Sequence, residues 1–345
     1  MKTAIIFSAI LVTVYFIYRM IEIQKRKRME KERLRAEYMR LNKLATIEDC
    51  LDMFDIFLEH LWNVLDVHHE DKVNSYANKD AKILNQMMFT KLTHLKKIVE
   101  GVGYTAKNGD RLNAIVDPTI VASLTRNIFE TVSVFNLIYR NTKSEDEKII
   151  IYDLWVSSGL KYRQRFQSTA TTPENIQKIA DEQKQIDQIE QEIKDTALYK
   201  SLDAKNQGKI DEKIKQKDFK IRFDGKEVIY LVWQDMCDVM GLNKDIFDNI
   251  YTYFSLYAHP SEVSVFQFET MFSKQHEEFK QLTTTNLKYC FSLMSVFVAD
   301  YINLFPQVKD TFEKLEIYKQ IALNTHNKML RDDSYSINDA WKKLK

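Results

Sequence analysis

The residues of this sequence whose types and spacing best suit chemistry are Arg126, Glu130, Ser255 and His259. Arg126 and Glu130 stand four residues apart, which places both side chains on one face of a helix. Ser255 and His259 have the same spacing, and Pro260 obliges the chain to leave the helix directly after His259. A histidine in that position can act as a general acid or base, or contact a phosphate. These four residues are therefore the candidate catalytic set.

Each pair also has a purely structural interpretation. The helix that begins near Pro118 is apolar on nearly every side. Arg126 and Glu130 are therefore either an ordinary exposed ion pair or a buried pair that must be fully hydrogen-bonded. A charged histidine at a helix C-terminus is stabilised by the helix dipole, which alone explains His259. The spacing does not choose between structure and catalysis.

The segments around these residues resemble a known family. The resemblance rests on three stretches, Leu124-Thr-Arg126-Asn-Ile-Phe-Glu130, Tyr152-x-x-Trp155, and Trp233 through Gly241 to Tyr251-Thr-Tyr-Phe-Ser255-Leu-Tyr-Ala-His259-Pro260-Ser261. They are similar to a bacterial family of uncharacterised helical proteins, domain of unknown function 5677, over residues 46–304. The resemblance implies that the four candidate residues come from two helices into one polar cluster. The activity of the family is not established.

A weaker similarity is to the helical HEPN ribonucleases, which place an arginine and a histidine close together on one helix. No arginine of this sequence is followed by a histidine at that spacing. Arg126 and His259 can replace the pair only if the fold brings them together. A distance of more than about 10 Å between their side chains would exclude them from one reacting site.

Composition and periodicity predict an all-α protein. The 345 residues include only 7 Gly and 4 Pro, too few for many tight turns. Apolar residues recur at helical spacing, with start signals at Thr46 and Asp117-Pro118. The helix over 287–304 is apolar on most sides and is expected at the centre of the bundle. The balance of 50 basic and 49 acidic residues excludes a uniformly basic nucleic-acid-binding protein.

Residues 1–23 are predicted to form a single transmembrane anchor. No charge occurs from Thr3 to Tyr18, and the apolar character continues to Ile23, which suffices to span a bilayer. A cleaved signal peptide is the alternative, but no small residues follow the apolar run.

Residues 24–45 are predicted to form a basic juxtamembrane helix. Between Arg19 and Lys43, ten basic and four acidic residues leave a net charge of +6. This excess places the N-terminus outside and the remainder of the chain in the cytoplasm. It also suits contact with anionic membrane lipid. An RNA-binding arm has the same charges, but here Tyr38 is the only interleaved aromatic residue.

The cytoplasmic part is predicted to be a helical core domain, residues 46–172 and 218–331, interrupted by a charged helical hairpin, residues 173–217. The hairpin is expected to protrude and to turn near Asn206-Gln207-Gly208, because its apolar stripe is narrow. A solvated protrusion and a partner-binding coiled coil both fit this composition. Residues 332–345 form a polar tail.

Within the second part of the core domain, the Asp224-Gly225 turn signal predicts a short hairpin or an ordered loop over 220–229, which is the one candidate for strands. Helices are expected over 228–240, 246–258 and 306–331.

Other titratable groups suggest little chemistry. Cys50, Cys237 and Cys290 are far apart and lack metal-ligand spacing, so we expect three buried thiols. His68-His69 lies in a polar stretch and is expected to be solvated. No metal or cofactor is predicted.

Two functions remain open. The first is a membrane-tethered cytoplasmic effector that acts on RNA or a nucleotide in defence or stress through the four candidate residues. The second is a non-enzymatic scaffold, in which these residues form a structural ion-pair network and residues 173–217 recruit a protein partner.

Overall fold

The structure is a computed structural model. It describes the backbone of residues 2–273, 277–340 and 342, and side chains from residue 13 onward except those of 244 and 273. Most described residues are helical, which confirms the all-α prediction. The longer helices are α1 (Lys2–Lys43), α2 (Ile47–His68), α3 (Tyr76–Val99), α4 (Pro118–Tyr139), α5 (Glu145–Arg163), α6 (Pro173–Asp195), α8 (Ala204–Gln216), α11 (Ile250–Ala258), α12 (Glu262–Ser273), α13 (Glu277–Leu304) and α15 (Ile317–Leu330).

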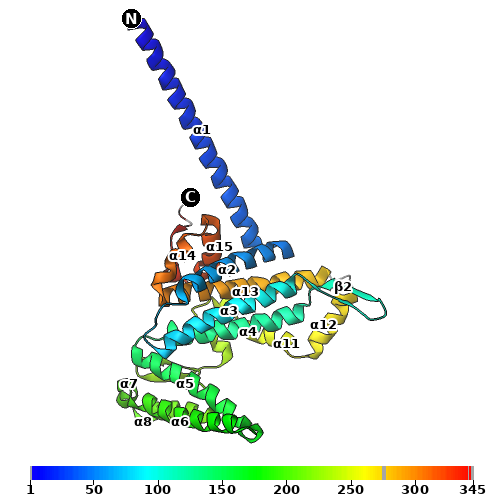
Figure 1. The fold of residues 1–345 in the computed structure, drawn as a ribbon, viewed down its shortest axis with the longest axis vertical. Helices are drawn as coiled ribbons and strands as arrows, with labels where there is room; N and C mark the ends of the chain where they lie inside the picture. The colour runs from blue at the N-terminus through cyan, green and yellow to red at the C-terminus, as the bar shows by residue number, and fades with distance from the viewer. Residues whose placement is uncertain (1, 274–276, 341, 343–345) are drawn as a thin grey trace.

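The core is organised around α13, which is buried over most of its length (Figure 1). Phe291 of α13 packs edge-on against Phe54 of α2, with 4.9 Å between ring centroids. Phe297 of α13 packs against Phe135 of α4 at the same separation. Aromatic pairs of this kind add to the free energy gained by burying the rings. The predicted central helix is thus confirmed.

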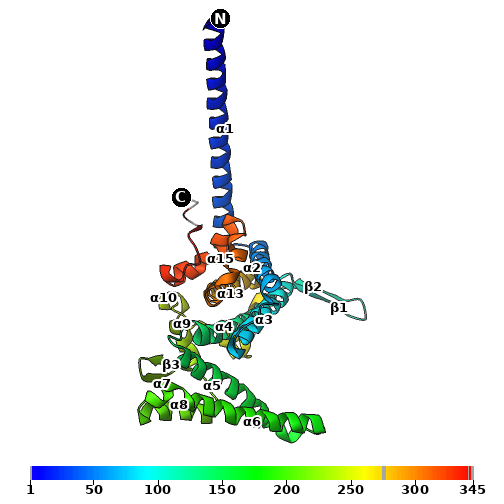
Figure 2. The same ribbon diagram turned by 60° about the vertical axis from the view of Figure 1, so that its left-hand side comes forward.

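Helix α1 extends away from the body, and its last turns attach it there (Figure 2). Arg40 donates to Asp49 Oδ1 and to Asp52 Oδ2, both at 2.8 Å. Asp49 also completes a capping box with Thr46 at the start of α2. This confirms the prediction that Thr46 begins the helix. The first residues of α2 therefore both begin that helix and hold the end of α1.

The predicted anchor falls largely on residues 1–12, whose side chains lie outside the described part of the chain. Among the described residues, no single helix is long and apolar enough to cross a membrane. Helix α13 and residues Pro306–Glu313 reach that length and composition only together, and they meet at 116°.

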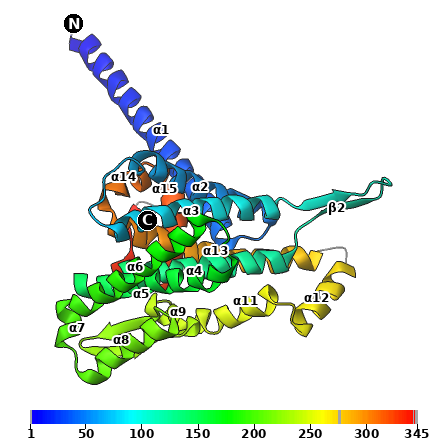
Figure 3. The same cartoon turned by 60° about the horizontal axis from the view of Figure 1, so that its bottom comes forward.

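Two antiparallel hairpins interrupt the helices. Strands β3 (Ile221–Asp224) and β4 (Glu227–Tyr230) pair around Gly225, which confirms the predicted turn. Strands β1 (Val102–Thr105) and β2 (Arg111–Ile115) form a second hairpin, which the sequence pattern did not predict. This hairpin projects from the body (Figure 3) and is exposed on both faces. It therefore lacks the alternation of buried and exposed residues that identifies strands.

The charged segment over 173–217 differs from the prediction in two respects. Helix α6 packs against α5, so the segment does not stand free. Its narrow stripe of Ile186, Ile189 and Ile193 is buried, because α5 supplies a facing surface. The chain turns at Thr196–Asp203, through the short α7 (Ala197–Ser201), whereas Asn206-Gln207-Gly208 lies inside α8. Thr196 and Asp203 cap the helices that follow them, and these caps set the turn.

Three predicted helices, over 228–240, 246–258 and 306–331, are broken into shorter elements. The segment expected to be helical over 228–240 begins as β4, continues through η2 (Trp233–Asp235) and ends as α9 (Met236–Val239). A short α10 (Lys244–Phe247) precedes α11. The segment after Pro306 contains η3 (Pro306–Val308), α14 (Lys309–Glu313) and α15, and η4 (Asp333–Tyr335) follows in the tail. η1 (Gln164–Thr169) extends α5.

Two predictions about titratable side chains have opposite outcomes. The three cysteines are buried, as expected, and burial raises the pKa of Cys50 and of Cys237 to about 12. His68 was expected to be solvated, and this is wrong, because its side chain is only 2% exposed. It packs against Phe305, and its Nδ1 donates to Asp71 Oδ2 at 2.9 Å. His69 is exposed.

Candidate functional site

Two neighbouring helices, α4 and α11, position the candidate residues (Figure 3). Asp117 caps α4 by accepting from the Thr119 N–H, and Pro118 begins the helix, as predicted. Helix α11 ends at Ala258, and His259 has an extended backbone, with φ −113° and ψ 146°. The residue before a proline is disfavoured in the helical conformation, so Pro260 accounts for this ending.

The guanidinium of Arg126 binds three side chains. Its Nε donates to Glu130 Oε1 at 3.1 Å, and its Nη2 donates to the Tyr251 hydroxyl at 2.6 Å. Its Nη1 lies 3.1 Å from His259 Nε2, across 133 residues of sequence. We define the Arg126 cluster as Arg126, Glu130, Tyr251 and His259. The structure thus brings together three of the four candidate residues, from two helices.

The contact between Arg126 and His259 determines which tautomer the neutral imidazole of His259 adopts. A guanidinium can only donate, so His259 Nε2 accepts with its lone pair, and in the neutral ring the proton is on Nδ1. The ring is exposed, whereas the side chain of Arg126 is 19% exposed and that of Glu130 is 29% exposed. The Arg126 cluster is therefore half-buried and open to solvent at His259.

Two aromatic residues, Tyr251 and Trp233, support the guanidinium of Arg126. Tyr251 accepts from Arg126, and its own hydroxyl lies 3.5 Å from Glu130 Oε1, to which it can donate. Trp233 stacks on Tyr251 with 5.8 Å between ring centroids and 15° between planes. Lys220 Nζ lies over the Trp233 ring at 5.4 Å. Burial raises the pKa of Tyr251, so its hydroxyl keeps its proton at neutral pH.

A family comparison identifies the segment that carries this cluster. Residues 112–280 match the model of the Family of unknown function (DUF5677). The chain carries a DUF5677 domain. No curated protein and no solved structure matches the chain. The DUF5677 match is shorter than residues 46–304, the extent that the resemblance suggested, but it contains every residue of the Arg126 cluster.

Ser255, the fourth candidate, also lies inside the DUF5677 domain. Its hydroxyl donates to the backbone carbonyl of Tyr251 at 2.7 Å, within the same helix. The backbone N–H of His259 donates to the Ser255 carbonyl at 3.2 Å, but no hydrogen bond of the Ser255 side chain among the described residues reaches Arg126, Glu130 or His259. This kind of back-bonding to the helix is common for serine and requires no catalytic role.

Lys91 reaches the DUF5677 domain from α3, outside the matched segment, and was not identified from the sequence. Its Nζ donates to the Thr131 hydroxyl at 2.5 Å, one residue from Glu130. Burial lowers the pKa of Lys91, although the Glu130 carboxylate opposes that shift. No local pattern could have found it, because Lys91 and Thr131 are 40 residues apart and meet through the packing of α3 on α4.

Proposed function

We propose that the DUF5677 domain cleaves RNA at a phosphodiester bond through the Arg126 cluster. The observation that carries this proposal is the 3.1 Å contact between Arg126 and the exposed His259. Of the five N–H donors of Arg126, two take part in none of the hydrogen bonds among the described residues. A guanidinium that is fixed on three sides and keeps two donors is suited to hold a phosphate in one orientation.

The proposed reaction requires only the groups of the cluster. When an RNA phosphate engages Arg126, His259 Nε2 is released and takes the proton of the adjacent 2′-hydroxyl. The 2′-oxygen then attacks phosphorus, the bond from phosphorus to the 5′-oxygen breaks, and the imidazolium returns its proton to that oxygen. Arg126 stabilises the negative charge that builds up on the phosphate oxygens. The products are a 2′,3′-cyclic phosphate and a 5′-hydroxyl.

The identity of the products tests this function. Full-length protein incubated with single-stranded RNA is expected to yield 2′,3′-cyclic phosphate ends, which mass spectrometry distinguishes from 3′-hydroxyl ends. DNA of the same sequence is the matched control, since it lacks the 2′-hydroxyl and should remain intact. Cleavage of both polymers, or of neither, contradicts the proposed reaction.

We also propose that the N-terminal part of α1 anchors the protein in a membrane with the body in the cytoplasm. Support comes from the apolar residues of 1–23 and from consecutive exposed side chains on the isolated α1, each more than half exposed: Val14, Tyr15, Phe16, Ile17 and Tyr18. A helix that exposes such a run to water loses the free energy that burial in lipid would provide.

The geometry of α1 limits how the basic residues reach the lipid. Residues 24–43 continue the same helix, and twenty helical residues span about 30 Å. Basic residues of this stretch are paired along the helix, among them Arg28 with Glu32, Arg33 with Glu30 and Arg40 with Glu37. Only the first turns after the anchor therefore contact lipid headgroups, and α1 holds the body away from the bilayer as a stalk.

Extraction of membranes tests the anchor. The full-length protein is expected to stay in the pellet at alkaline carbonate and to dissolve in detergent. A variant that lacks residues 2–23 is the matched control and should be released by carbonate. Release of the intact full-length protein by carbonate would contradict the anchor.

A non-enzymatic scaffold is the second candidate, and a separate observation favours it. Tyr104 of the β1–β2 hairpin and Phe266 of α12 are 66% and 65% exposed, as protein-binding surfaces often are. If the scaffold is the function, the Arg126 cluster is a structural network that links α4 to α11. RNA would then remain uncleaved in the product assay.

A further inference from the structure

A polar cavity of about 210 Å³ lies at the C-terminal end of α4, and none of its lining residues belongs to the Arg126 cluster. The end of α4, α13, α14 and the tail after α15 enclose it. Its polar lining comes from seven side chains: Arg140, Asp300, Asn303, Lys309, Ser334, Tyr335 and Ser336. A cavity of this size has room for a phosphate group and for several water molecules.

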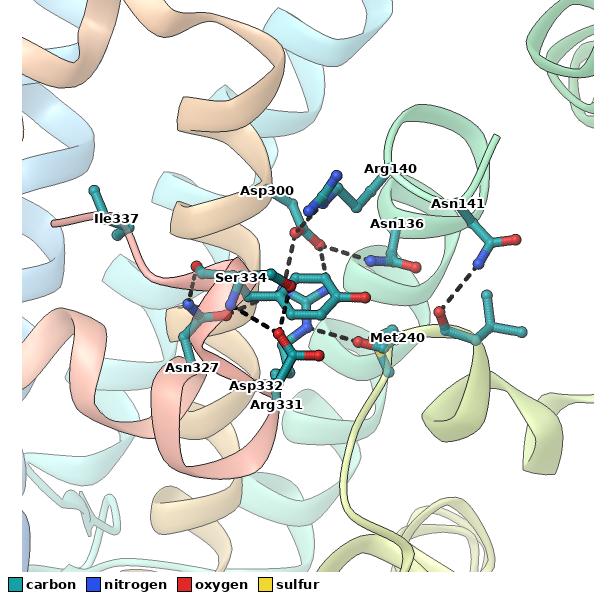
Figure 4. Close-up of polar contacts among 12 residues, drawn as sticks. Asn136, Arg140, Asn141, Met240, Asp300, Asn327, Arg331, Asp332, Ser334 and Ile337 are labelled. Atoms are coloured by element: carbon teal, nitrogen blue, oxygen red, sulfur yellow. Dashed lines mark hydrogen bonds and ion pairs between the residues drawn. The ribbon is translucent and has the colours of Figure 1, made fainter. Parts of the chain in front are cut away.

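Asp300 is already neutralised within the protein. Arg331 donates to Asp300 Oδ1 at 2.8 Å and to Oδ2 at 3.2 Å, and Asn136 donates to Oδ2 at 2.7 Å (Figure 4). The side chains of Arg331 and Asp300 are 0% and 2% exposed. The charges of Arg331 and Asp300 cancel, so this buried pair adds no net charge beside the cavity. The carboxylate of Asp300 is therefore neutralised without Arg140.

Arg140 is a second cation beside Asp300, with which it forms a long ion pair. Its Nε lies 3.8 Å from Asp300 Oδ1, beyond hydrogen-bond distance, and its guanidinium lies over the Tyr335 ring at 4.9 Å. Its side-chain N–H groups make no hydrogen bond among the described residues, although the side chain is only 30% exposed. A half-buried guanidinium whose donors lack acceptors is costly unless a ligand or water supplies them.

Lys309 adds a second positive charge to the cavity. It pairs with Glu313 at 3.3 Å, but both side chains are more than 40% exposed, so water weakens this attraction. Asp332, whose carboxyl accepts from Ser334, also approaches Arg140 and Arg331 from the solvent side. Neither Glu313 nor Asp332 lines the cavity, whereas Arg140 does.

We propose that this cavity binds a phosphate group, with Arg140 donating to two of its oxygens and Lys309 providing a second charge. The guanidinium matches two phosphate oxygens at once, and a lysine acts as a point charge on the third. Tyr335 holds the plane of Arg140 from one side. The phosphate can belong to a small soluble molecule or to a lipid headgroup, and this site is separate from the proposed RNA-cleaving cluster.

Calorimetric titration of detergent-solubilised full-length protein tests the site with two probes, inorganic phosphate and a short-chain phosphatidic acid. Saturable binding of at least one probe is expected, and the probe that binds more tightly identifies the source. Arg140→Gln should weaken that binding at least tenfold, and Lys309→Gln should weaken it several-fold. Arg165→Gln is the matched control, because Arg165 also lies over a tyrosine, Tyr162 at 4.4 Å, but does not line the cavity.

Three results would overturn the proposal. They are no saturable binding of either probe, binding by Arg140→Gln equal to that of the unaltered protein, and equal weakening by Arg165→Gln. Circular dichroism establishes that each variant is folded. If Arg140→Gln fails to fold, Lys309→Gln decides the question, and unchanged binding by that variant overturns the proposal.

Discussion

Arg331→Met is expected to lower the free energy of unfolding by about 3–5 kcal/mol, because it leaves the buried carboxylate of Asp300 without the cation that is hydrogen-bonded to it, and Arg140 is 3.8 Å away. The substitution also removes the hydrogen bond from Arg331 Nε to the carbonyl of Met240, which is 2.6 Å long. That bond joins the end of α15 to the segment after α9, so its loss loosens the packing of the tail. Chemical denaturation followed by circular dichroism measures the change.

Two further variants separate the buried charge from the lost contact. Arg331→Met combined with Asp300→Leu removes both charges and should recover much of the lost free energy, since well-packed apolar residues can replace a buried ion pair. Arg28→Met breaks a pair with Glu32 whose side chains are 82% and 60% exposed, and should leave the free energy of unfolding nearly unchanged. Equal effects of Arg331→Met and Arg28→Met would show that the pair to Asp300 does not stabilise the core.

Arg126→Lys is expected to reduce the proposed RNA cleavage by about 10²–10³-fold, because lysine cannot donate in three fixed directions at once. The positive charge is retained, so the loss reports the geometry of the guanidinium and not the charge alone. His259→Ala should remove the cleavage that remains, since it deletes the group that transfers the proton. Single-turnover rates with single-stranded RNA measure both effects.

Arg165→Lys is the matched control for Arg126→Lys, because it makes the same exchange at an arginine that lies over a tyrosine outside the cluster. It should cleave RNA at the rate of the unaltered protein. The melting temperatures of all these variants should stay close to one another, since the Arg126 cluster is half-buried and open to solvent at His259. Cleavage by Arg126→Lys at the unaltered rate would exclude the guanidinium from the proposed mechanism.

The helix caps and the charged segment over 173–217 show which features of a fold can be predicted from a sequence and which cannot. The caps at Thr46 and Asp117 were recognised correctly, since a cap depends on side chains only two or three residues from the backbone groups that they bind. The turn of the charged segment was misplaced at Asn206-Gln207-Gly208, because a single glycine can also be accommodated inside a helix. The packing of α6 on α5 depends on a second helix, which the narrow apolar stripe could not reveal.

The sequence by itself determined the helical class, the pairing of Arg126 with Glu130, and the exit of the chain from α11 at His259, because each depends on neighbours within one helical turn. Only the tertiary structure decided that Arg126 meets His259 across 133 residues. It alone brought Lys91 beside this site and placed Arg331 against Asp300. Such contacts depend on which helix faces pack together, and this packing buries apolar residues from segments that are far apart in the sequence.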